Sequence, residues 1–141
     1  MSSMVNLLLV EDDEVDIQGL KRAFVKGRIG NPITVARDGI EALEFLRGEN
    51  GRPQLPRPHL ILLDLNMPRM NGLEFLEAIR ADEDLKSTIV FMITTSKAEE
   101  DKARAYAQNV AGYIVKQDPA NTFMQAVALL ERYWKIVEFP E

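Results

Sequence analysis

Five short runs of apolar residues recur along the chain, and each is followed by a segment in which apolar side chains are spaced differently. The runs are rich in Val, Ile and Leu and do not alternate with polar positions, which is typical of β-strands that are covered on both faces. They cover residues 5–10, 33–36, 60–63, 89–94 and 112–115. The pattern therefore predicts five buried strands rather than half-exposed ones.

The segments between the runs place apolar residues three and four positions apart, as amphipathic α-helices do. These predicted helices cover residues 15–26, 39–47, 72–81, 98–109 and 119–137. Strict alternation of strand and helix is typical of a parallel sheet. We therefore expect an α/β fold with a five-stranded parallel sheet and helices on both faces, the doubly wound, flavodoxin-like (βα)5 architecture.

The stretch RGENGRPQLPRPHL interrupts this regularity. It holds three prolines and two glycines, so it is neither helix nor central strand. It predicts a long loop between the second helix and the third strand, and it ends near His59, to which we assign no function. No segment resembles a linker between domains. We expect one domain over residues 1–141, with a core of about 4–132 and a C-terminal extension of about 133–141.

Composition narrows the class of protein. The chain has 141 residues, 22 acidic against 17 basic side chains, a net charge of −5 and no cysteine. This balance argues against nucleic acid as a direct partner, and disulfides and thiolate metal sites are excluded. No apolar run reaches the length of a membrane span, and no signal-peptide pattern opens the sequence. These features predict a soluble, cytoplasmic protein that does not bind a membrane.

Polar side chains stand at the ends of four predicted strands. Glu11 and Asp12 follow the first strand, Asp64 follows the third, Thr94 ends the fourth and Lys116 follows the fifth. In open parallel sheets, ligands bind beyond the carboxyl ends of the strands. We therefore expect three carboxylates, a hydroxyl and an ammonium to converge on one edge of the sheet.

The carboxylates of residues 11–14 crowd negative charge at that edge. Two such charges a few ångströms apart cost about 1 kcal/mol even in water. The acidic start of a helix explains Asp13 and Glu14, because the helix dipole favours acids there. The remaining oxygens suit a hard cation such as Mg²⁺. Beside Mg²⁺ and a lysine, the Asp64 carboxylate could attack a phosphoryl group whose oxygens Thr94 would help to bind.

The motifs LVEDD, ARDGIEAL, LILLDLNMPRMNGLEFL, IVFMITTS and GYIVKQ occur in this order along nearly the whole chain. Together they resemble the receiver domain of two-component response regulators, the family of the chemotaxis response regulator. The resemblance implies that Asp64 is the phosphoacceptor and that a sensor histidine kinase supplies the phosphoryl group from a phosphohistidine. It further implies that Asp12 and Asp64 bind Mg²⁺ directly, Glu11 through water and Asn66 through its backbone carbonyl.

The same resemblance implies that Thr94 and Lys116 hold the phosphoryl group. Tyr113 would be an aromatic switch residue that turns inward with Thr94 and changes the surface around the fourth helix and fifth strand. The chain departs from the family at Gln117, where a proline with a cis peptide bond is usual. A cis bond without proline costs about 2.5–4 kcal/mol, so we expect a trans Lys116–Gln117 bond.

The proline-rich loop and the tail ERYWKIVEFPE resemble more narrowly the stand-alone regulators that are paired with bacterial phytochromes. Trp134 and Val137 continue the apolar stripe of the last helix, whereas Tyr133 and Ile136 fall off it, and Phe139 precedes Pro140, where the helix should already have ended. An exposed apolar patch usually marks an interface. We therefore expect a homodimer through the last helix and tail, with the alternative that the tail folds back onto its own domain.

Two other functions fit parts of the pattern. Mg²⁺-dependent phosphatases of the haloacid dehalogenase type also use a strand-end aspartate, but they resemble Asp-x-Asp, and this chain has Asn66 at the second position and no cap domain. A pseudo-receiver that binds partners without chemistry usually lacks an acid, the threonine or the lysine, and none is lost here. We expect a protein that catalyses only its own phosphorylation and dephosphorylation.

Overall fold

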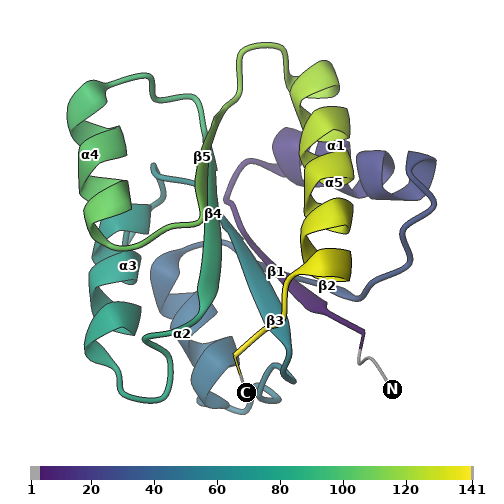
Figure 1. Ribbon diagram of the computed structural model, residues 1–141. Helices are drawn as coiled ribbons and strands as arrows, with labels where there is room; N and C mark the ends of the chain where they lie inside the picture. The colour runs from purple at the N-terminus through teal and green to yellow at the C-terminus, as the bar shows by residue number, and fades with distance from the viewer. Residues whose placement is uncertain (1–3, 141) are drawn as a thin grey trace.

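Five parallel strands form one sheet in the order β2-β1-β3-β4-β5 in the computed structural model, which describes residues 4–140 (Figure 1). The strands are β1 (Asn6–Val10), β2 (Ile33–Ala36), β3 (His59–Leu63), β4 (Ile89–Thr94) and β5 (Gly112–Val115). The chain moves outward from β1 to β2 and then returns past β1 to β3. The strand order therefore reverses between β1 and β3, which is where sheets of this kind form a ligand crevice.

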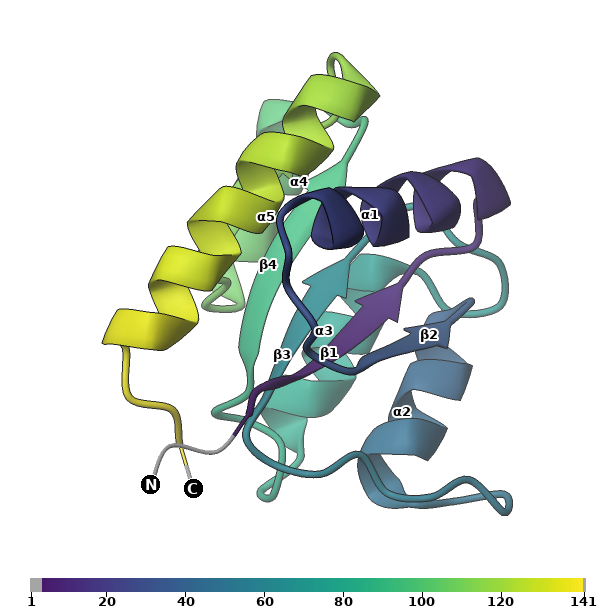
Figure 2. The ribbon, with the colours of Figure 1, turned by 90° about the vertical axis from the view of Figure 1, so that its right-hand side faces the viewer.

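Helices cover both faces of the sheet, as the alternating pattern predicts. They are α1 (Glu14–Lys26), α2 (Gly39–Arg47), α3 (Gly72–Ala81), α4 (Glu99–Ala107) and α5 (Pro119–Ile136). Helices α1 and α5 lie on one face and α2, α3 and α4 on the other (Figures 1 and 2). Neighbouring strand residues bury on opposite faces, so that Leu8 joins one apolar core and Leu9 the other. The doubly wound fold is confirmed.

The first backbone N–H groups of a helix have no partner within the helix, and a side chain just before the helix can accept hydrogen bonds from them. Asp13, Asp38 and Asn71 cap the first three helices by accepting backbone hydrogen bonds. Helix α4 has no such side-chain cap, and Ala105 is its one fully buried residue. This weak signal explains why the prediction of 98–109 was too long.

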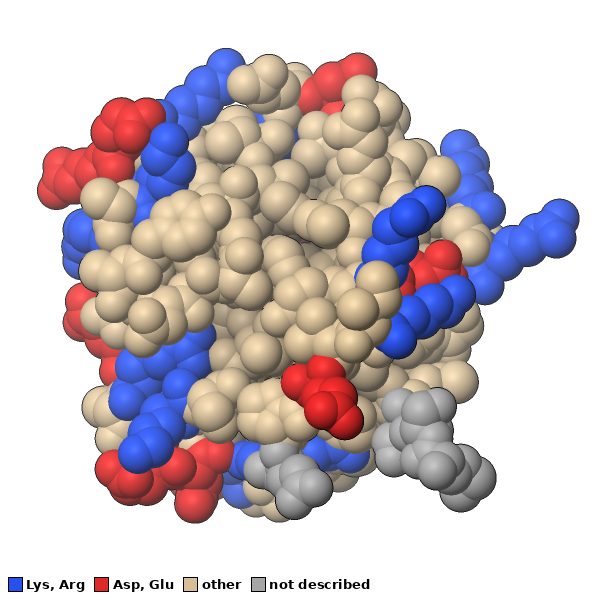
Figure 3. Space-filling model, viewed as in Figure 1, with Lys and Arg blue, Asp and Glu red and all other residues tan. Residues whose placement is uncertain are grey.

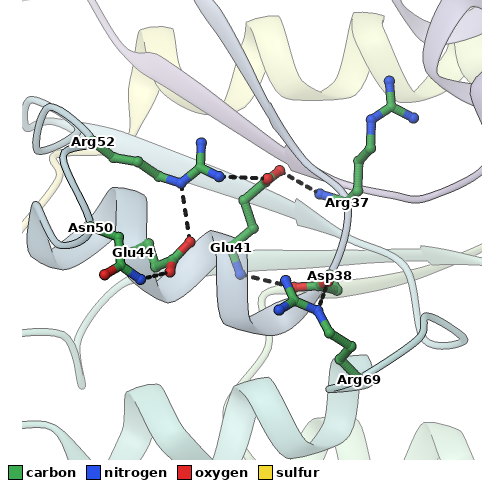
Figure 4. Close-up of polar contacts among 7 residues, drawn as sticks. All are labelled: Arg37, Asp38, Glu41, Glu44, Asn50, Arg52 and Arg69. Atoms are coloured by element: carbon green, nitrogen blue, oxygen red, sulfur yellow. Dashed lines mark hydrogen bonds and ion pairs between the residues drawn. The ribbon is translucent and has the colours of Figure 1, made fainter.

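The proline-rich stretch is a loop, as predicted, and it is held against α2 (Figure 4). Arg52 pairs with Glu41 at 2.8 Å and with Glu44 at 3.1 Å. Leu55 is buried in the core beside α2, α3 and α4, and its N–H donates to the Phe45 carbonyl at 2.9 Å. The loop is therefore part of the packed structure and lies away from the carboxyl ends of the strands.

The C-terminal tail differs from the prediction. Tyr133 was expected off the core stripe, yet its ring packs edge-on against Phe91 with ring centres 5.0 Å apart, and Phe139 packs edge-on against Tyr133. Gly112 pairs with Phe91 in the sheet and has no side chain, and a Cβ there would lie 3.0 Å from the Phe91 ring, so the glycine leaves room for the ring that Tyr133 contacts. Val137 was expected in the core and is exposed. Of the off-stripe group, Ile136 alone is strongly exposed, at 80%.

His59 is the first residue of β3, not a residue before it, and it is buried. Its Nδ1 atom has no hydrogen-bond partner, and burial lowers the pKa of the imidazole to about 4. The folded state therefore keeps His59 neutral at pH values where the unfolded chain already binds a proton. The contribution of His59 to stability is therefore largest above pH 6.5 and declines as the pH falls toward 4.

This difference predicts a pH dependence of the free energy of unfolding. Between pH 6.5 and 4 the His59 contribution should fall by about 3 kcal/mol. His59→Phe keeps a ring of similar shape but does not titrate. Urea denaturation of both proteins over this range should give a shallower loss for the variant, and parallel curves would contradict the prediction.

Candidate functional site

A cleft of about 280 Å³ opens at the carboxyl ends of the strands, beside the point where the strand order reverses. It is lined by Glu11, Asp12, Asp13, Asp16, Asp64, Asn66, Thr95 and Lys116. Five of the eight are carboxylates and one is a lysine. The expected convergence of acidic and basic groups at this edge is present.

Asp64 occupies the centre of the site because β3 is the central strand. Its backbone N–H donates to the Val10 carbonyl at 2.9 Å, which fixes it beside β1. Burial raises the pKa of the Asp64 carboxyl above its ordinary value, and the nearby Lys116 charge opposes this shift. A hydrogen bond with Thr94 also favours the charged form.

Gly72 allows the chain to pass close to Asp64. A Cβ atom at this position would lie 2.3 Å from the Asp64 carbonyl oxygen and 3.0 Å from the Leu65 Cα. The Gly72 N–H in turn donates to the Leu65 carbonyl at 2.8 Å. The start of α3 is therefore packed directly against the peptide that carries Asp64.

Three carboxylates could hold a metal ion. One oxygen each from Glu11, Asp12 and Asp64 lies within 4.8 Å of the others. Glu11 is 1% exposed, and burial raises its pKa to about 7 although the hydrogen bond from Lys116 opposes the shift. Crowded, partly desolvated carboxylates are the donor set that a hard divalent cation requires. The residues present fit such an ion.

Lys116 brings the positive charge of the site. Its Nζ atom donates to Glu11 Oε1 at 2.5 Å and to Asp16 Oδ2 at 2.8 Å, and it lies 3.9 Å from Asp64 Oδ1. Its backbone N–H donates to the Thr94 carbonyl at 2.7 Å. The Lys116–Gln117 bond is trans, as expected, since the cis bond found within residues 4–140 is Arg57–Pro58.

Thr94 and Tyr113 both contact Ser96, in the segment that follows β4. Thr94 is fully buried, and its Oγ1 accepts a hydrogen bond from the Ser96 N–H at 3.3 Å. The half-buried Tyr113 donates its hydroxyl to the Ser96 carbonyl at 3.0 Å. The segment after β4 therefore contacts both residues that the sequence pairs as a switch.

The loop that carries Asn66 is fixed from the side of α2. Arg69 adopts a left-handed backbone with φ of 60° and donates from Nε to Asp38 Oδ2 at 2.7 Å (Figure 4). The Gly39 N–H donates to the Met70 carbonyl at 3.0 Å. Asn66 is exposed at the mouth of the cleft, where the sequence places it.

Asp16 and Thr95 line the cleft but do not appear among the residues that the motifs indicate. Asp16 lies in the first turn of α1, where an acidic residue is already explained by the helix dipole. Its distance from Asp13 is one helical turn, and this spacing was the one available sign that both face the same edge. Thr95 follows the strand-end threonine and carries no signal of its own.

Comparison with known proteins agrees with the geometry. The model of the response regulator receiver domain matches residues 7–128, so the chain belongs to this family. Response regulator Rcp1 of Synechocystis is 34% identical over 128 residues, which cover 91% of this chain and 87% of Rcp1. The resemblance to receiver domains is thereby confirmed, and so is the narrower resemblance to phytochrome-associated regulators.

Two solved structures extend the comparison. The phosphorylated cyanobacterial phytochrome response regulator RcpA has a TM-score of 0.88 and 34% identity, with 99% of this chain and 100% of that chain covered. The Mn²⁺-bound form of Rcp1 has a TM-score of 0.85 at the same identity and coverage. Each protein shares the fold over its full length. The protein is thus a receiver-domain response regulator, and none of its described helices is long and apolar enough to cross a membrane.

Proposed function

We propose that the chain accepts a phosphoryl group on Asp64 from the phosphohistidine of a sensor histidine kinase, with Mg²⁺ as cofactor. The observation that carries this is the convergence of Glu11, Asp12 and Asp64 with the buried Lys116 in one cleft. Mn²⁺-bound and phosphorylated relatives support divalent-metal binding and phosphorylation in proteins of this kind.

Each residue has a distinct role in this proposal. An Asp64 oxygen forms the bond to phosphorus while the phosphorus–nitrogen bond breaks and its electron pair returns to the imidazole. Asp12 and Asp64 would hold Mg²⁺ directly, Glu11 through water and Asn66 through its carbonyl, and the bound ion supplies charge neutralisation. Lys116 and Thr94 would hold the phosphoryl oxygens.

Membership of the receiver family and the intact set of acids, threonine and lysine favour this proposal over the phosphatase and the pseudo-receiver. We infer that the protein catalyses only its own phosphorylation and dephosphorylation. Incubation with acetyl phosphate and Mg²⁺ should add one phosphoryl group to the intact mass. A protein without an adduct would be a pseudo-receiver, and steady turnover of phosphomonoesters would indicate the phosphatase.

Thr94 and Tyr113 form the proposed switch. New phosphoryl oxygens on Asp64 would draw the Thr94 hydroxyl, and the Ser96 segment that contacts both residues would move with it. Loading with fluoroberyllate, which mimics the phosphoryl group, should shift amide resonances across residues 94–116. Shifts confined to residues 11–13 and 64–66 would mean that no such switch operates.

The partner and assembly are also proposals. Relatives described as phytochrome or bacteriophytochrome response regulators support a phytochrome-type kinase as the phosphoryl donor. The face between α4 and α5 is uncharged over much of its centre (Figure 3), and Leu129 and Ile136 are exposed on α5. We retain a homodimer through α5 and the tail, although Tyr133 and Phe139 fold back. Sedimentation of the full chain at high micromolar concentration tests it, with Ile136→Asp as the variant that should remain monomeric.

A further inference from the structure

Asp16 contacts Lys116 but does not belong to the group of carboxylates that could hold a metal ion. Its Oδ2 atom accepts a hydrogen bond from the Lys116 ammonium at 2.8 Å. The Lys116 side chain is 3% exposed and that of Asp16 is 17% exposed, so water screens this pair weakly. Asp16 is not one of the three carboxylates whose oxygens gather within 4.8 Å, which we call the metal triad.

The hydrogen bonds of the Lys116 ammonium go to residues other than Asp64, the proposed phosphoacceptor. Its two hydrogen bonds go to Glu11 at 2.5 Å and to Asp16 at 2.8 Å, whereas the nearest Asp64 oxygen is 3.9 Å away. An ammonium has three N–H donors, so one remains for a further acceptor. Burial lowers the pKa of Lys116, but the hydrogen bonds to Asp16 and Glu11 outweigh it and raise the pKa, so the group stays charged.

Glu11 has two partners in this arrangement, the proposed metal ion and the Lys116 ammonium. It is a member of the metal triad and also the shortest partner of Lys116. If Glu11 and Asp64 were the only anions near Lys116, the ammonium and a divalent cation would compete for the same oxygens. Two cations in one small cleft also repel each other strongly when they are partly buried. A carboxylate beyond the triad removes the conflict because it gives the ammonium its own acceptor.

We propose that Asp16 is a positioning residue that holds Lys116 outside the metal triad, so that the lysine and a divalent cation occupy the site together. This rests on the proposed function, since it assumes that Glu11, Asp12 and Asp64 bind metal. Asp16 acts through Lys116 and does not contact the phosphoryl group. With Asp16 present, metal binding withdraws Glu11 from Lys116 without leaving the ammonium unpaired.

A double-mutant cycle on Mn²⁺ affinity separates this role from simple attraction between Asp16 and the metal. Free Mn²⁺ is counted by electron paramagnetic resonance in the unphosphorylated protein. Asp16→Asn should weaken Mn²⁺ binding about fivefold or more when Lys116 is present, since the ammonium then competes for Glu11 and Asp64. In the Lys116→Met background the same substitution should change the affinity by less than about twofold.

Three further proteins sharpen the result. Asp16→Glu keeps a carboxylate and should recover most of the affinity. Glu14→Gln removes a charge from the same helical turn, where Glu14 pairs with Arg37 at the surface, and should leave the affinity unchanged. Thermal unfolding without metal confirms that each variant is folded, and Asp16→Ser replaces Asp16→Asn if the latter is not.

The outcomes are distinct. A loss of affinity that is equal in the Lys116 and Met backgrounds would overturn the positioning role while leaving the metal site intact. Wild-type protein that binds no Mn²⁺ would instead overturn the proposed metal site and, with it, the role of Asp16. A loss that depends on Lys116 and is recovered by Asp16→Glu supports the proposal, because a merely structural residue would show neither property.

Discussion

Asp64→Asn should abolish the phosphoryl adduct that acetyl phosphate and Mg²⁺ form on the wild-type protein. The amide keeps the size of the side chain but lacks the anionic oxygen that attacks phosphorus. The substitution removes the proposed nucleophile and one proposed Mg²⁺ ligand together, while the other carboxylates of the cleft are unaltered. Intact-mass measurement over a time course gives the result directly.

Asp13→Asn is the matched control for this loss. Asp13 lines the same cleft and caps α1, and asparagine is as good a cap as aspartate. The control should therefore gain the adduct as the wild type does. An adduct on the Asp64→Asn protein, located by peptide mapping to another carboxylate, would show that the phosphoacceptor is misassigned.

Gly72→Ala should cost about 3 kcal/mol or more of the free energy of unfolding. The added Cβ would lie 2.3 Å from the Asp64 carbonyl oxygen, and this neighbour is backbone in the centre of the sheet rather than a flexible side chain. Relief requires the start of α3 or the Asp64 peptide to move. We therefore also expect slower phosphoryl uptake in whatever fraction remains folded.

Gly30→Ala gives the comparison. Apart from Gly30 itself and its two chain neighbours, no heavy atom lies within 4 Å of a Cβ built at this position. This substitution should stay within about 0.5 kcal/mol of the wild type. Urea denaturation of the three proteins measures both effects, and similar midpoints for the two variants would mean that the close approach at Gly72 is easily relieved.

The fold was predictable because local signals agreed with one another. Continuous apolar runs marked the strands, and helical spacing placed residues 39–47 and 72–81 where α2 and α3 begin and end. The predicted boundaries of an element were less accurate where these signals were weak. Helix α4 buries little and has no side-chain cap, so its ends were placed too far apart. Tyr133 was misplaced since helical spacing alone does not show that Gly112 leaves room for the Phe91 ring.

The site was predictable where strand ends define it and not where a helix contributes. Asp64, Thr94 and Lys116 each follow or end a strand, so the topology alone brings them to one edge. Asp16 enters from α1, and its contact with Lys116 depends on how the helix is rotated over the sheet. The close packing at Gly72 likewise depends on the direction in which α3 begins. The roles of these residues remain proposals that the experiments above address.

The pairing of Lys116 with Glu11 and Asp16 joins positions 105 and 100 residues apart. During synthesis the acidic residues leave the ribosome first, and their ammonium partner comes only with β5, the last strand at the edge of the sheet. A nascent chain that has not yet added β5 carries the carboxylates without the cation that offsets them. If the proposed function holds, competence to receive a phosphoryl group would arrive only with the last strand.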